Sequence, residues 1–124
     1  MTFTKEAIIA ILKLGFTIAE ADGKKTDKQI DIIWEVVERF HWAMGEMSLS
    51  IIDDIAALNT PETVKRIAFL TTEQKKYIVA YLTKIMVSGA STPYEARSFM
   101  NELSMWASLP RMSEREALDY YNSI

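Results

Sequence analysis

The chain carries the same corner twice, and this repetition limits the folds it can adopt more than any other feature. When the chain is shifted by 66 residues, Gly23 aligns with Gly89 and Thr26 aligns with Thr92. Glycine permits the backbone conformations that end a helix, and a threonine hydroxyl accepts N–H groups that the next helix leaves unpaired. Each copy therefore predicts a helix, a glycine turn and a second, threonine-capped helix.

The similarity between the two copies extends along the helices that flank each corner. Apolar positions coincide under the same shift, as Phe16 and Leu82 do. Repeat units are therefore expected over about 5–40 and 73–107, related by a pseudo-twofold axis.

Helix-start signals divide the whole chain into short segments. A Ser or Thr able to cap a helix precedes each of seven helical patterns: Thr4, Thr26, Ser48, Thr60, Thr71 or Thr72, Thr92 and Ser113. The predicted helices span 5–21, 27–40, 48–58, 61–70, 73–87, 93–107 and a short stretch from 114 onward. No strand is expected, so the fold class is an all-α orthogonal bundle of about seven helices. The first and fifth helices are apolar around most of their circumference and should form a central pair.

Composition limits the classes of protein that remain. A length of 124 residues fits one domain, over residues 1–124, with enough chain to bury a core. The chain has no cysteine, which excludes disulfides, thiolate nucleophiles and zinc sites built from sulfur. The net charge of −3 disfavours nucleic acid as a partner. No membrane span or signal peptide is expected, which points to a cytoplasmic protein. The oligomeric state stays open.

The first corner carries a short motif that matches a known family. Residues 18–23 read Ile-Ala-Glu-Ala-Asp-Gly and precede the capped helix from Asp27. With this motif the chain resembles, over about residues 5–107, the tellurite-resistance TerB-like family, which includes the N-terminal domain of the DjlA-type J-domain co-chaperones. The resemblance implies a pseudo-symmetric all-helical fold, a role in stress resistance through protein–protein interaction, and a divalent-cation site of acidic residues at the turns. Residues 87–89 depart from the family pattern, because Ser88 stands where the family has an aspartate.

An acidic group follows the first turn. Asp22 stands at the end of the first helix, and Asp27, Asp31 and Glu35 recur at four-residue intervals on the next, which stacks their carboxylates along one helix face. Ca²⁺ and Mg²⁺ prefer oxygen ligands of this kind. Asp22, Asp27 and Asp31 are therefore candidate ligands for a divalent cation. The alternative is an ordinary exposed acidic face, since a helix N-terminus favours negative charge anyway.

Residue types for covalent or acid–base catalysis are scarce. His41 is the only histidine and falls at the expected end of a helix, where capping is the ordinary role. No Ser–His–Asp signature or Gly-rich phosphate loop is present. An EF-hand is excluded, because Ile18 and Gln29 would fall at its first and last ligand positions. The chain is therefore expected not to be an enzyme; a carboxylate hydrolase would need a cleft beside Asp22 and Asp27.

Methionine and tryptophan gather in the two segments that follow the paired helices. One set is Trp42, Met44 and Met47, and the other is Met105, Trp106 and Met112. Core filling is the simpler interpretation, but these side chains also suit adaptable binding surfaces. The preferred function is a non-enzymatic TerB-like interaction or stress-response module with another protein as partner. The alternative is a divalent-cation-binding domain that uses the acidic turn.

Overall fold

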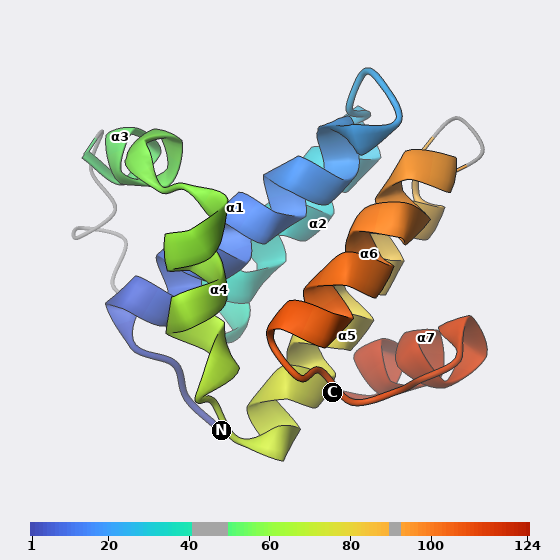
Figure 1. Cartoon of the computed structure of the whole chain (residues 1–124). Helices are drawn as coiled ribbons and strands as arrows, with labels where there is room; N and C mark the ends of the chain where they lie inside the picture. Colours follow the sequence, from blue (N-terminus) through green and yellow to red (C-terminus); the bar gives the residue numbers. More distant parts are fainter. Residues whose placement is uncertain (41–49, 90–92) are drawn as a thin grey trace.

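The structure is a computed structural model that describes residues 1–40, 50–89 and 93–124. These described residues form helices and contain no strand, which confirms the all-α prediction (Figure 1). The seven helices are α1 Lys5–Ala21, α2 Asp27–Arg39, α3 Ser50–Ala57, α4 Thr60–Ala68, α5 Thr72–Val87, α6 Tyr94–Trp106 and α7 Glu114–Ser123.

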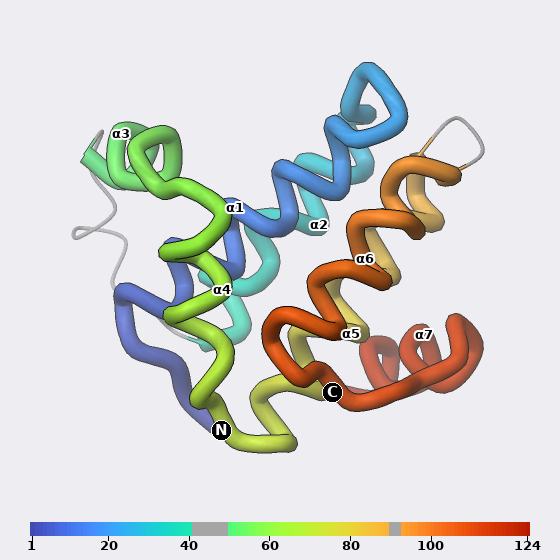
Figure 2. Tube along the Cα trace, in the orientation of Figure 1, coloured from blue at the N-terminus to red at the C-terminus, as the bar shows by residue number. Residues whose placement is uncertain are grey.

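The helices α1 and α5 lie at the centre of the molecule as predicted. The helix α1 packs against α2, α3, α4, α5 and α6, whereas α7 packs against α5. The tube in Figure 2 shows α3 and α4 on one side of α1 and α7 beside α5 on the other. Most residues of α1 and α5 are buried, so these helices provide the larger part of the core.

The paired helices pack reciprocally, as a pseudo-twofold repeat requires. The helix α1 contacts α6, and its counterpart α5 contacts α2, the counterpart of α6. Gly15 and Tyr81 occupy the same repeat position and meet each other where α1 and α5 cross. A Cβ added to Gly15 would lie 2.6 Å from the Tyr81 hydroxyl oxygen, which donates a hydrogen bond of 2.8 Å to the carbonyl of Ile33. A glycine in α1 is therefore required for the approach of α5.

Most predicted caps are confirmed. The side chains of Thr4, Thr26, Thr71 and Ser113 each accept an N–H group from the first turn of the following helix. Ser48 lies outside the described residues. The prediction for Thr60 is wrong: the cap is Asn59, whose side-chain oxygen accepts the Glu62 N–H at 2.9 Å. Asn is at least as good a cap as Thr, so the helix begins one residue earlier and Pro61 still falls in its first turn.

The two corner glycines serve different physical purposes. Gly23 has a φ of +120°, a backbone conformation that other residues rarely adopt. Gly89 is not in that region, but a Cβ there would lie 2.9 Å from the Gln29 side-chain nitrogen. The corner at Gly89 therefore needs glycine for space and not for its conformational freedom.

Within the part of the chain that the structure describes, every helix falls short of the length and apolar character needed to cross a membrane.

Candidate functional site

The aspartate of the first corner caps a helix of the other repeat unit. Asp22 lies at the C-terminal end of α1, and its two carboxylate oxygens accept the N–H groups of Glu95 at 2.7 Å and Ala96 at 3.0 Å. Both donors belong to the first turn of α6, where the helix dipole favours a negative charge. The N-cap position of α6 is Pro93, which makes no side-chain cap hydrogen bond. The carboxylate of Asp22 therefore supplies acceptors at the start of this helix; Thr92, the predicted cap, lies outside the described residues.

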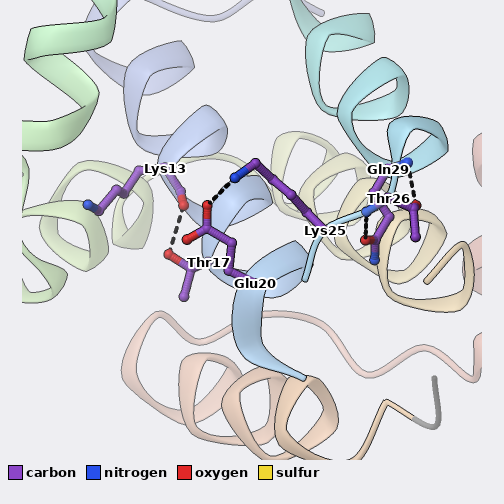
Figure 3. A network of polar contacts seen from close by, with 6 residues as sticks. All are labelled: Lys13, Thr17, Glu20, Lys25, Thr26 and Gln29. Carbon is purple, nitrogen blue, oxygen red and sulfur yellow. Dashed lines mark hydrogen bonds and ion pairs between the residues drawn. The ribbon is translucent and has the colours of Figure 1, made fainter. Parts of the chain in front are cut away.

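The opposite contact runs from the start of α2 to the end of α5. Gln29 is buried, and its side-chain nitrogen donates to the Ile85 carbonyl at 2.9 Å, while the Thr26 hydroxyl donates to the Ser88 carbonyl at 3.3 Å. Figure 3 shows the reciprocal bonds between Thr26 and Gln29 that hold these side chains in place. At the repeat position of Gln29 the second unit has Glu95, a carboxylate with no N–H to donate, so this bond has no counterpart.

The structure does not bring the three candidate metal ligands together. Asp22 is occupied at the start of α6, whereas Asp27 and Asp31 lie exposed on α2. Glu35, the next acidic residue on that face, accepts a hydrogen bond of 2.6 Å from the Tyr121 hydroxyl. Among residues 1–40, 50–89 and 93–124, no three acidic or histidine side chains are close enough to share a metal ion. The space beside Asp22 has a volume of about 20 Å³, which is room for one water molecule.

A larger hollow lies between α5, α6 and the segment that leads into α7. This groove has a volume of about 830 Å³. Val79, Thr83 and Met86 form its floor, and their spacing places them on one face of α5. The face of α6 from Arg97 to Met105 lines one side, and residues 109–114 together with Glu116 line the other.

The polar groups of the groove are largely bound to one another. The hydroxyls of Thr83 and Ser104 each donate to the carbonyl four residues earlier in their own helices, at 2.7 and 2.9 Å. Arg97 donates to Glu114 from two nitrogens, at 2.8 and 2.6 Å. Glu116 accepts the Ser113 N–H in the capping box of α7. The groove therefore offers a partner both the apolar side chains of its methionines and the exposed polar groups of Asn101 and Arg111.

The two repeat units differ most at this groove. The floor positions Val79 and Met86 correspond, under the shift of 66 residues, to Lys13 and Glu20 on α1. In the first unit the aromatic rings of Phe16 and Trp34 fill the space between α1 and α2, with their centroids 5.9 Å apart. Their counterparts in the second unit are Leu82 and Met100. The helices α1 and α2 pack directly, whereas a groove separates part of α5 from α6.

The predicted interaction patch falls partly on this groove. Met105 and Met112 line it, and Met105 is 76% exposed. Trp106 lies outside the lining; it is 47% exposed and packs edge-on against Phe99. The other members of the predicted patch, Trp42, Met44 and Met47, lie outside the described residues, as does His41.

Sequence reasoning missed the groove residues contributed by α5 and the middle of α6. Val79, Met86 and Met100 were assigned to no site, because their spacing also fits an ordinary buried helix face. The repeat itself marks Val79 and Met86, because the equivalent positions Lys13 and Glu20 in the first unit are charged. Val79 and Met86 are buried, so an apolar side chain where the other unit has a charge indicates a local difference in packing between the two units.

Comparison with known proteins supports the fold and leaves the family open. No family model matches the chain, and no curated protein matches it. Among solved structures, the chain is similar to a protein of unknown function from Porphyromonas gingivalis, with 26% sequence identity and a TM-score of 0.79. The match covers 100% of this chain and 99% of that one. The all-helical arrangement is therefore shared over the full length of both chains.

Proposed function

We propose that this chain is a non-enzymatic protein-interaction module that binds an apolar segment of a partner protein in the groove between α5, α6 and α7. The groove carries this proposal, because its volume of about 830 Å³ suits a cluster of partner side chains. The resemblance to the TerB-like family supports the same role, since that family is associated with protein–protein interaction.

The chemistry of the lining supports binding over catalysis. Met86, Met100, Met105 and Met112 come from three different segments and meet at one hollow. Methionine has a flexible, polarisable side chain that adapts to the shape of a partner. The ion pair between Arg97 of α6 and Glu114 of α7 neutralises two of the four charged side chains that line the hollow.

A displayed-peptide selection tests this proposal with a defined probe. A library of short helical peptides is selected against the immobilised protein, and the affinities of enriched peptides are measured by fluorescence anisotropy. We expect Met105→Arg to weaken binding about tenfold, because it places a long cation in an apolar contact region. Met105 is largely exposed, so the fold should tolerate this change.

The matched control is Ile52→Arg, which makes the same kind of change on α3. Ile52 is an apolar side chain that is 51% exposed and lies outside the groove. Its replacement should leave peptide affinity unchanged. Failure to enrich any peptide, or equal affinity of the wild type and Met105→Arg, would overturn the proposed function.

A further inference from the structure

The lining groups that remain without a hydrogen-bond or ion-pair partner among the described residues also indicate what kind of segment the groove binds. Resting on the proposed function, we infer that the partner segment is an amphipathic α-helix that carries an Asp or Glu positioned to pair with Arg111.

A helix fits this groove better than an extended strand does. The groove is built from helices and their connection, and no strand edge exists among the described residues to pair with an extended backbone. An extended segment would leave backbone N–H and C=O groups unpaired as it lost water, whereas a helix satisfies most of its own. The α6 wall from Arg97 to Met105 extends about 12 Å at 1.5 Å per residue. That length matches about two turns of a partner helix, with apolar side chains at positions i, i+3 or i+4, and i+7.

The charge requirement follows from which lining groups remain unpaired. The positive charge of Arg97 is matched by Glu114, and Glu116 accepts an N–H at the start of α7, where the helix dipole favours its negative charge. Arg111 is exposed and lines the groove without a hydrogen bond or ion pair to any described residue. Of the two arginines that line the groove, Arg111 is therefore the one without a carboxylate from the described residues beside it, and a carboxylate on the partner would pair with it.

Asn101 gives the partner a second polar contact point. It is exposed on α6, lines the groove, and has no side-chain partner in the described parts of the chain. Its amide can both donate and accept a hydrogen bond, so it tolerates several polar residues and sets less specificity than Arg111.

A charge-reversal experiment tests the role of Arg111. The probes are one peptide enriched in the selection and the same peptide with its acidic residue replaced by Lys. Arg111→Glu should weaken the acidic peptide by about threefold to tenfold and strengthen the Lys peptide by a similar factor. The matched control is Arg115→Glu, because Arg115 is an exposed arginine on α7 that does not line the groove. That reversal should change both affinities by less than about twofold.

The outcomes separate this inference from the proposed function. If Met105→Arg lowers peptide affinity and Arg111→Glu leaves it unchanged, the groove binds a partner but does not require an acidic residue. Enriched peptides without a shared acidic position, or equal effects of the two arginine reversals, would also overturn the inference. If Met105→Arg has no effect on binding, the proposed function fails first.

Discussion

At the residue scale, Gly15 and Tyr81 show how one repeat position holds two different side chains. They are equivalent under the repeat, and they lie against each other where α1 packs on α5. Two large side chains would collide at such a position, so a large residue on one helix requires a small one on the other. The two repeat units therefore contribute side chains of different size to the core at this position.

Gly15→Ala should destabilise the protein by about 1–3 kcal/mol, although alanine favours a helix. The new Cβ would lie 2.6 Å from the Tyr81 hydroxyl oxygen, inside van der Waals contact. The free energy of unfolding from urea titration measures the effect. Tyr81→Phe removes that oxygen, so the alanine should destabilise the Tyr81→Phe protein less than the wild type. A double-mutant cycle with no coupling would contradict this account of the contact.

The carboxylate of Asp22 is assigned a structural role that can be measured separately from cation binding. Asp22→Ala removes both acceptors at the start of α6 and should lower the free energy of unfolding by about 1–2 kcal/mol. Asp31→Ala, an exposed acidic residue of α2, is the matched control and should change stability by less than about 0.5 kcal/mol. Adding Ca²⁺ or Mg²⁺ tests the cation alternative. A large Ca²⁺-dependent stabilisation that Asp22→Ala abolishes would contradict the capping role.

The role of Asp22 was beyond sequence reasoning for a physical reason. Its hydrogen-bond partner Glu95 lies 73 residues away along the chain. An aspartate beside a turn has the same local pattern whether it binds a metal, caps its own helix or caps a distant one. Only the approach of α1 to α6 distinguishes these cases.

At the scale of elements, helix starts were predictable because most caps are local. Thr26 and Gln29, three residues apart, bond each other's backbone, and Thr71 with Gln74 and Ser113 with Glu116 repeat this arrangement. Such bonds depend on spacing alone. The start of α6 is the exception, since its cap comes from the other repeat unit.

The attachment of α7 to the body of the molecule depends on buried tyrosines. Burial raises the pKa of Tyr77 and Tyr81 on α5 and of Tyr121 on α7 above the usual value of 10.0. The hydrogen bond from Tyr121 to Glu35 raises the pKa of Tyr121 further. Each hydroxyl therefore keeps its proton in the folded state at a pH where the unfolded chain loses it.

This difference predicts a loss of stability in alkali. Because the folded-state pKa is raised, the contribution is complete below about pH 10 and declines as pH rises above it, by about 1.4 kcal/mol per pH unit for each tyrosine. Urea unfolding at several pH values between about 9 and 12 measures the slope of the free energy of unfolding against pH. Tyr121→Phe should reduce this slope by the contribution of one tyrosine, about 1.4 kcal/mol per pH unit. Tyr94→Phe, at an exposed position, should leave the slope unchanged. Equal slopes for the wild type and Tyr121→Phe would contradict the assignment.

At the scale of the whole molecule, the two repeat units share a core and differ in what their surfaces present. The shared apolar periodicity made the all-helical bundle and its central pair predictable from the sequence. The groove was not predictable, because its volume depends on how far α6 and the segment leading into α7 lie from α5. Lys13 and Glu20 of the first unit correspond to Val79 and Met86 of the second, so the two units differ on this face of α1 and α5.

The most direct test of the groove as the binding surface is NMR of methionine methyl groups during titration with an enriched helical peptide. Four methionines line the groove: Met86, Met100, Met105 and Met112. Met1 lies outside it and is 54% exposed, so it serves as an internal control. We expect the methyl signals of the groove methionines to shift in proportion to occupancy while that of Met1 stays fixed. Peptide binding that leaves all four groove methyl signals unmoved would contradict the account.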